Sequence, residues 1–167
     1  MPTDVKLITT HLIGDLVSNA WESPRRRVNY NFHSSFEENP NRFLNVMVES
    51  TYVAPHRHLD PPKPESFIVL EGKVGFLVFD DSGKVTERYV VEPGTECLGI
   101  DMAPGIWHSV VVLSGYAVLY EVKPGPYSPA NDKDFASWAP REGEPGWQEY
   151  LARLTASFKT PVAPADH

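Results

Sequence analysis

The stretch Tyr52-Val53-Ala54-Pro55-His56-Arg57-His58 places two histidines two residues apart at the end of an apolar run. In an extended chain, residues i and i+2 point to the same side. We therefore expect His56 and His58 to present their imidazoles side by side, toward whatever this strand encloses. Because neutral imidazole is the commonest protein ligand of metals, the pair is a candidate metal site.

Two further candidate ligands follow along the chain. Glu65 starts the next apolar run, and His108 ends the stretch Pro104-Gly105-Ile106-Trp107-His108. Four such groups would be costly to bury without partners, and a metal ion removes that cost. Three imidazoles and one carboxylate suit Fe(II), Mn(II), Ni(II) or Zn(II), without distinguishing among them. We predict one divalent transition metal ion, held by His56, His58, Glu65 and His108.

The neighbours of these residues predict an apolar enclosure. If the strands alternate regularly, Tyr52 and Ala54 share the face of His56, and Phe67 shares the face of Glu65. Most of these companions are apolar. A pocket with apolar walls and a few convergent polar groups is typical of a small-molecule site, so we expect a small-molecule ligand.

Composition limits the other partners. The chain has 167 residues, a net charge of -7, and 41% hydrophobic residues, which is enough for a core. An acidic chain without a basic patch disfavours nucleic acid and anionic membrane surfaces as partners. The single cysteine, Cys97, excludes an internal disulfide. No secretory signal and no apolar run near the ~20 residues of a membrane span are visible, so we expect a cytoplasmic protein.

Short strands separated by turn signals follow one another from residue 42 to residue 122. The turns include Glu71-Gly72-Lys73 and Ser114-Gly115. This rhythm predicts a β-sandwich or barrel. The expected strands are residues 43–54, 66–70, 74–79, 85–91, 96–101, 107–113 and 116–122.

Helical patterns flank the strands. Thr9 or Thr10 can cap a helix that carries apolar residues on one face, and an amphipathic pattern returns near the C-terminal end. We expect a single domain of residues 1–167. Its parts are an N-terminal helical lead (1–24), a β-barrel core (25–122), a loop rich in proline, glycine and aromatic residues (123–145) and a C-terminal helix (146–158).

One segment alternates polar and apolar side chains before the barrel core. Its polar face either is an exposed edge, lies on a partner subunit, or lines a pocket where it binds a carboxylate or sugar hydroxyls. Glu121 and Tyr127 are a candidate acid/base pair near the metal. The alternative for those two is a surface carboxylate and a loop anchor. The candidate substrate-binding residues are Arg27, Asn29, Asn31 and His33.

Two of these patterns resemble the motifs of the cupin superfamily. Pro55-His56-x-His58, Glu65 and Gly72 resemble the first cupin motif, and Pro104-Gly105-x-x-His108 resembles the second. The resemblance implies a mainly β fold, the cupin double-stranded β-helix or jelly-roll barrel, with a short N-terminal helix and a C-terminal helix. It also implies the four ligands already proposed. The sequence departs from the motif in the six residues between His58 and Glu65, where three or four are usual.

A wider pattern resembles the WbuC-type cupin metalloproteins, which are found among bacterial surface-polysaccharide gene sets. That resemblance implies a metalloprotein that binds or converts a sugar or nucleotide sugar, for example as a metal-dependent isomerase or oxygenase. The alternatives are a non-catalytic sugar-binding or sensor module and a metal-free sugar epimerase. Dimerisation through a sheet is common for the fold, so we expect a homodimer. The pattern comprises Arg27-x-Asn-x-Asn-x-His33, Pro55-His-Arg-His58, Phe79-Asp-Asp-x-Gly83, Trp107-His-Ser109, Glu121-x-Lys-x-Gly-Pro-Tyr127 and Trp138-Ala-Pro-x-Glu142.

Overall fold

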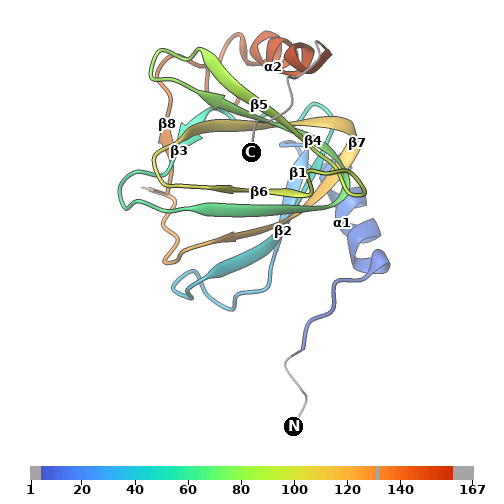
Figure 1. The fold of residues 1–167 in the computed structure, drawn as a ribbon. Coiled ribbons are helices and arrows are strands. Elements are labelled where there is room, and N and C mark those ends of the chain that lie inside the picture. Colours follow the sequence, from blue (N-terminus) through green and yellow to red (C-terminus); the bar gives the residue numbers. More distant parts are fainter. Residues whose placement is uncertain (1–4, 131, 160–167) are drawn as a thin grey trace.

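The fold is a curled antiparallel β-structure with one helix on each of two sides (Figure 1). The computed structural model describes residues 5–130 and 132–159. These residues form mostly strands, with one helix before and one after them, so the predicted mainly β fold with an N-terminal and a C-terminal helix is confirmed. The elements are α1 (Thr10–Glu22), β1 (Arg27–Asn31), β2 (Asn41–Val48), β3 (His56–Arg57), β4 (Glu65–Phe79), β5 (Val85–Val91), β6 (Gly99–Met102), β7 (Trp107–Lys123), β8 (Asp134–Phe135), α2 (Trp147–Ala156) and η1 (Ser157–Lys159).

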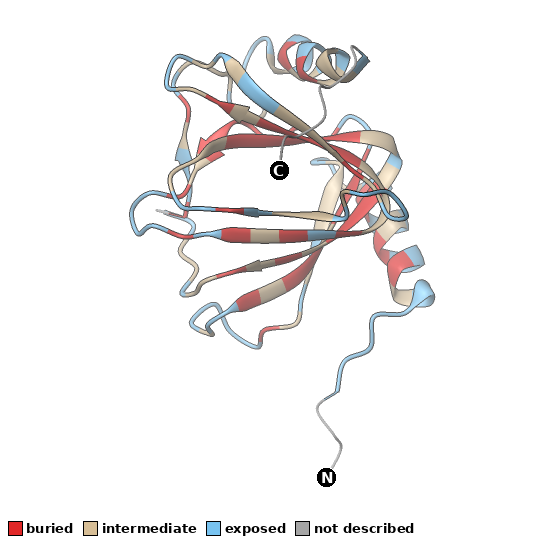
Figure 2. Cartoon of the chain, in the orientation of Figure 1, coloured by how far each residue is buried: buried red, intermediate tan, exposed pale blue. Residues whose placement is uncertain are grey.

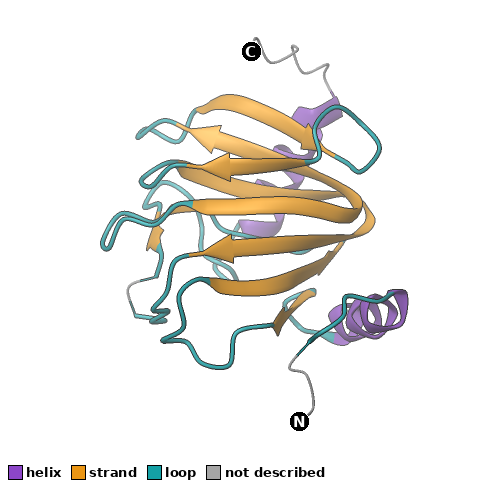
Figure 3. Cartoon of the chain, turned by 60° about the horizontal axis from the view of Figure 1, so that its bottom comes forward, coloured by secondary structure: helices purple, strands orange, loops and turns teal. Residues whose placement is uncertain are grey.

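Two long strands, β4 and β7, belong to both halves of the barrel. The second half of β7 and the first half of β4 lie between β2 and β6, and β1 pairs with the outer edge of β2. The first half of β7 and the second half of β4 lie between β3 and β5, and β8 pairs with β3. Figure 3 shows the strands curling around a common interior.

The expected turns at residues 71–73 and 114–115 are wrong, because both segments continue as strands. β4 runs through Gly72 and β7 runs through Ser114 and Gly115, and the register between the two strands shifts at these points. Gly72 has a φ of 79°. A Cβ at Gly72 would collide with the backbone of Tyr116 and Ala117. Glycine is required at this irregularity, because an L side chain fits neither the dihedral nor the space.

At these irregularities, the side chains that point to the interior change from odd-numbered to even-numbered positions on β4, and from even-numbered to odd-numbered positions on β7. On β4 the interior side chains step from Val69 to Val74, and on β7 they step from Val112 to Ala117. A regular strand alternates with a period of two, so an odd step means that one residue has been inserted. Each long strand can therefore bend and still keep an apolar face toward the same interior.

The expected strand over residues 43–54 is also wrong in its second half. β2 ends at Val48, and Ser50 adopts a positive φ of 69° in the turn that follows. The chain after this turn is not in a ladder until His56. Tyr52 consequently points away from the interior. Its ring stacks on Trp147 of α2 at 5.7 Å between centroids, and its hydroxyl donates to the Pro140 carbonyl at 2.7 Å.

Both helices cover outer faces of the barrel, as their apolar stripes predict. Thr9 caps α1 by accepting a hydrogen bond from the Leu12 amide at 3.1 Å. Figure 2 shows buried residues along the strands and on the inward sides of the helices, with an exposed N-terminal lead. Residues 1–4 of the expected lead lie outside the described residues. Among the described helices, none has the length and apolarity needed to cross a membrane.

Candidate metal centre

Three elements bring the four predicted ligands together. β3 and β7 pair so that His56 lies directly opposite His108, and His58 follows β3 by one residue. Glu65 is the first residue of β4. The four side chains are buried, with 3–5% of each residue exposed, and their ligand atoms all lie within 4.8 Å of one another. The longer loop before Glu65 therefore does not keep its carboxylate out of the group.

Each histidine is oriented by a backbone carbonyl. Nδ1 of His56 lies 2.9 Å from the Ala54 carbonyl oxygen, and Nδ1 of His108 lies 2.9 Å from that of Ile106. Nδ1 of His58 is hydrogen-bonded to the Asp132 carbonyl oxygen. A carbonyl can only accept, so Nδ1 carries the proton in all three rings. The Nε2 lone pairs are thereby directed at the centre, which is the arrangement of metal-binding histidines.

At the centre, hydrogen-bond acceptors of the histidines lie against the carboxylate oxygens of Glu65, which are also acceptors. Nε2 of His58 lies 3.0 Å from Oε1 of Glu65, and Nε2 of His108 lies 3.2 Å from Oε2. Nε2 of His58 and Oε2 of Glu65 are buried and make no hydrogen bond among the described residues. Two facing acceptors are satisfied only by an added proton or by a cation. The donor set therefore fits a divalent metal ion.

The electrostatics of the group agree with this fit. Burial holds the pKa of His56 well below its usual value, and the positive charge of Lys133 lowers it further, so the ring is neutral at pH 7. Burial opposes ionisation of Glu65. The pairing of its carboxylate with His108 and His58 outweighs burial and holds the Glu65 pKa well below its usual range. Neutral imidazole beside carboxylate is the protonation state in which metals bind.

A buried ionic network supports the centre from one side. The Asp132 carboxylate accepts from the Lys123 ammonium at 2.8 Å and from that of Lys63 at 3.4 Å. Lys63 also donates to the Pro126 carbonyl at 2.6 Å, and the Lys123 nitrogen lies 3.7 Å from Oε1 of Glu65. All three charged residues of the network are buried, with 4–6% of each exposed. Because the Asp132 carbonyl also orients His58, this network fixes the position of one candidate ligand.

A cavity of about 500 Å³ opens beside the four candidate ligands. Part of its wall is apolar and includes Phe67, Phe76 and Val110. A polar wall comes from β1, β2 and the second half of β7, where Glu121 lies beside Phe67 in the ladder. Its side chains include Asn29, Asn31, Asn41, Asn45, Glu121 and Lys123.

The four residues predicted to bind substrate all line this cavity. Asn29 and Asn31 are exposed on β1 and turn toward it. Arg27 is largely occupied, because its guanidinium donates to Glu142 at 2.7 Å and to the Tyr52 carbonyl at 3.0 Å. Nδ1 of His33 hydrogen-bonds the Arg42 backbone, and its Nε2 is buried without a partner among the described residues.

The two residues predicted as an acid/base pair also line the cavity but are separated. Oε2 of Glu121 accepts from the Asn45 amide at 3.0 Å. Burial raises the pKa of Glu121 to about 7, and the nearby charge of Glu65 adds to the effect. Tyr127 packs on Phe36 at 5.1 Å between centroids and makes no hydrogen bond to Glu121 among the described residues.

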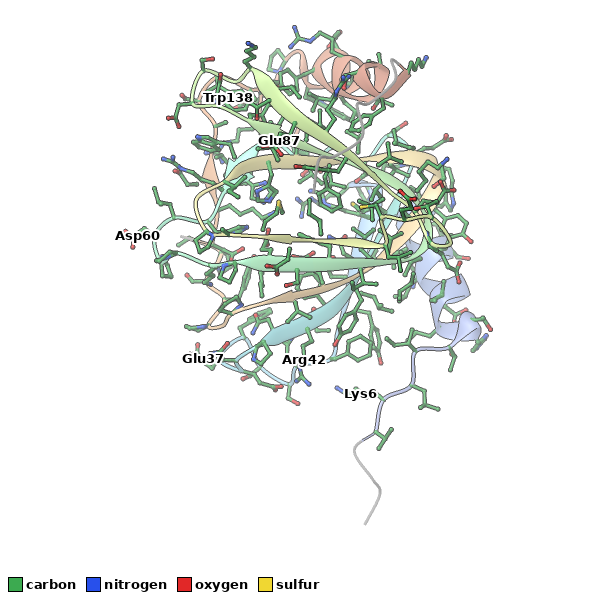
Figure 4. All side chains as sticks on the ribbon, in the orientation of Figure 1. Lys6, Glu37, Arg42, Asp60, Glu87 and Trp138 are labelled. Atoms are coloured by element: carbon green, nitrogen blue, oxygen red, sulfur yellow. The ribbon has the colours of Figure 1, made fainter. Side chains whose placement is uncertain are left out.

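Two residues singled out by motif lie outside the cavity. Arg57 donates to Asp134 at 2.7 Å and stacks over Trp107 at 4.2 Å. Trp138 packs on Phe79 at 5.1 Å between centroids, beyond the barrel wall (Figure 4). Both residues therefore stabilise the outer side of the barrel.

Sequence reasoning missed several polar residues of the centre and the cavity. Alternation could have found Lys123, because it continues the interior series of Leu119 and Glu121. Most of the others come from loops, where no periodicity marks them. The missed residues are Arg25, Asn41, Asn45, Lys63, Lys123, Asp132, Lys133, Arg141 and Glu142.

Known proteins share this fold at low sequence identity. A family model described as "Domain of unknown function (DUF6016)" matches residues 8–91. No curated protein matches the chain in sequence. The capsular polysaccharide assembling protein CapF from Staphylococcus aureus superposes with a TM-score of 0.56 at 19% identity. The superposition covers 68% of this chain and 32% of CapF, so the chain spans about a third of the length of that relative.

Two smaller proteins match over nearly their whole length. TT1209 from Thermus thermophilus gives a TM-score of 0.52 at 18% identity, covering 74% of this chain and 98% of that one. An RmlC-like cupin with a double-stranded β-helix from Methanocaldococcus jannaschii gives 0.50 at 12% identity, covering 75% and 94%. The predicted cupin double-stranded β-helix is thereby confirmed. The WbuC subtype stays a prediction.

Proposed function

We propose a function for this chain as a member of the DUF6016 family, to which the match over residues 8–91 assigns it. It is a cupin metalloprotein that holds one divalent metal ion through His56, His58, Glu65 and His108. A small polar molecule binds beside the ion in the cavity. The observation that carries this proposal is the set of buried acceptors at the centre. Nε2 of His58 lies against Oε1 of Glu65 and Nε2 of His108 lies against Oε2, and both Nε2 of His58 and Oε2 of Glu65 lack a hydrogen-bond partner among the described residues.

The polar wall favours a polyhydroxylated ligand. Side-chain amides both donate and accept, as hydroxyl groups do. The Asn45 amide nitrogen is used by Glu121, while its buried Oδ1 has no partner among the described residues. A ligand hydroxyl would satisfy that oxygen. The ligand class is therefore a sugar or nucleotide sugar, as the resemblance to WbuC-type proteins implies.

Surface-polysaccharide metabolism is the proposed setting. CapF is a capsular polysaccharide assembling protein, and the shared fold motivates tests with the same class of sugars here. We also propose that residues 1–167 form one domain, and that the protein is a cytoplasmic homodimer. The proposed binding of a metal ion and a ligand requires neither a cytoplasmic location nor a dimer.

Glu121 is the group best placed to move a proton. When bound, the metal ion supplies Lewis-acid polarisation of an oxygen atom on the ligand. A carboxyl group with a pKa of about 7 can accept or donate a proton at neutral pH. The Asn45 amide orients this carboxyl toward the cavity. These residues suit an isomerisation, and an oxygenase is the other class that an Fe(II) ion would permit.

A ligand screen with metal-loaded protein tests the proposed function. Binding of sugars and nucleotide sugars is measured by calorimetry, and products are followed by mass spectrometry. We expect binding in the wild type, binding about three- to tenfold weaker for Asn45→Ala, and none above background for His56→Ala/His58→Ala. Asn19→Ala, on the exposed side of α1, should bind as the wild type does.

The outcomes of this screen separate the alternatives. A ligand that stays unchanged over hours identifies a binding or sensor module, whereas turnover identifies an enzyme. Equal binding by the His56→Ala/His58→Ala variant would contradict a metal-dependent site and favour the metal-free epimerase.

The raised pKa of Glu121 predicts a pH-dependent stability in metal-free protein. Its folded pKa of about 7 exceeds the usual value of 4.5. The protonated group therefore stabilises the fold below pH 4.5, and this contribution is lost as the pH rises through 7. Glu121→Gln has no such proton. Between pH 5 and pH 8 the wild type should lose about 2–3 kcal/mol relative to the variant.

Urea unfolding of both proteins in chelator, at pH 5 and at pH 8, measures this difference. Glu87→Gln is the control, because Glu87 is exposed on β5. A difference for Glu121→Gln that is no larger than that of the control would show that Glu121 ionises at an ordinary pKa.

A further inference from the structure

The cavity contains positive charge that the protein does not neutralise. Five of its side chains are cationic and four are carboxylates. Glu142 accepts from both Arg25 and Arg27, and Asp132 accepts from Lys123. Among the described residues, neither of the two remaining cations belongs to an ion pair. These two are Lys133 and Arg141.

Both unpaired cations line the cavity close to Phe135 in sequence or in space. Phe135 in β8 lies opposite His56 in the ladder, and the two rings are 5.9 Å apart between centroids. The Arg141 guanidinium stacks over Phe135 at 4.1 Å from the ring centroid. Lys133 is two residues before Phe135, and both line the cavity, while Asp134 between them turns outward to Arg57. The two cations therefore lie on the side of the cavity next to a candidate metal ligand.

Around Lys133, burial and neighbouring positive charge outweigh the stabilising effect of the Glu65 and Glu121 carboxylates on its ammonium group. Solvent reaches Lys133 through the cavity. Burial by the cavity walls nevertheless lowers the pKa of its ammonium group, because it removes part of the water that would stabilise the charge. The positive charge of Lys123 lowers the pKa further. The chain as a whole carries a net charge of -7, so this local excess of positive charge runs against the overall balance.

We propose that Lys133 and Arg141 form an oxyanion-binding subsite, so that the molecule bound in the cavity carries a phosphate or carboxylate group. The proposal rests on the cavity being a ligand site, as proposed above, and it narrows the ligand to an anionic sugar. A guanidinium presents a planar fork that matches both oxyanions, and an ammonium adds a point charge. Arg27 is not included, because Glu142 and three other acceptors already occupy its donors.

Titration with simple oxyanions tests this subsite. The probes are inorganic phosphate and acetate, followed by NMR or calorimetry against chloride at the same ionic strength. We expect saturable binding to the wild type that is at least about tenfold weaker in Lys133→Gln/Arg141→Gln. Lys84→Gln/Arg153→Gln removes the same charge from exposed positions outside the cavity, and it should bind like the wild type. Tighter binding of phosphate indicates a phosphorylated ligand, and tighter binding of acetate indicates an acidic sugar.

The same titration on His56→Ala/His58→Ala separates this subsite from the metal centre. Oxyanion binding should persist in that variant, because Lys133 and Arg141 are intact. Binding lost with the histidines but kept in Lys133→Gln/Arg141→Gln would place the anion on the metal and overturn the proposal. Absence of saturable binding in the wild type would overturn it as well. A failure of the metal centre alone would leave oxyanion binding unchanged.

Discussion

Replacing Asp132 with alanine is expected to lower the free energy of unfolding by about 3–5 kcal/mol, because it leaves buried charges unpaired. The Asp132 carboxylate is the shared partner of Lys63 and Lys123, and all three residues are buried. The Pro126 carbonyl keeps one bond to Lys63, and Glu65 remains 3.7 Å from Lys123. Neither contact replaces the lost carboxylate. Urea unfolding in chelator, with no metal bound, measures the effect.

A matched variant two residues away controls for this experiment. Asp134 pairs with Arg57 at 2.7 Å, but 47% of its side chain is exposed. Exposed pairs contribute about 0–1 kcal/mol, so Asp134→Ala should change the stability little. A loss below 1 kcal/mol for Asp132→Ala would mean that the two lysines find other partners or lose their charge.

Metal binding is expected to give the second large effect, a rise in stability that depends on His58. Free metal at a thousandfold excess over its dissociation constant adds about 4 kcal/mol to the free energy of unfolding. His58→Ala removes one candidate ligand, so the variant should lose this increment whatever its own stability. Thermal unfolding with chelator and then with Zn(II), Mn(II), Ni(II) or Fe(II) measures the increment in each protein.

An exposed histidine supplies the control for metal addition. His11 lies on α1 with 90% of its side chain exposed, beside Asp15. His11→Ala should show the same increment as the wild type. If His58→Ala were stabilised as strongly as His11→Ala, the metal would be bound elsewhere on the protein.

The location of the candidate metal centre could be predicted from the sequence because two of its histidines are two residues apart and the other two ligands stand at the ends of apolar runs. His56 and His58 lie two apart around β3, and His108 lies opposite His56 across a strand pair. Glu65 starts the next apolar run, and the structure brings its carboxylate within 3.2 Å of both His58 and His108. The six intervening residues form a loop closed by a bridge between Leu59 and Pro62.

The sequence pattern divides each long strand in two, because the irregularities within β4 and β7 contain turn residues. Gly72 and the pair Ser114 and Gly115 are typical of tight turns, and local sequence cannot distinguish a turn from a bulge within a strand. The pairing of β4 with β7 decides the outcome, since each strand continues along the other on both sides of the shift. This pairing is a contact between residues far apart in the sequence.

The charged groups around the cavity could not be predicted for a similar reason. Asp132 and Lys133 belong to a loop that β8 fixes against β3, and Lys63 lies between prolines. Neither segment has a periodicity that indicates which side chains point inward. Their roles depend on tertiary contacts, such as the Asp132 carbonyl that orients His58.

The most direct test of the metal centre is elemental analysis of protein purified without a polyhistidine tag, after loading with each divalent ion and removal of the excess. The wild type is predicted to hold one ion per chain, and His56→Ala/His58→Ala is predicted to hold none. Full occupancy in the double variant would contradict the assignment of His56, His58, Glu65 and His108 as the metal ligands.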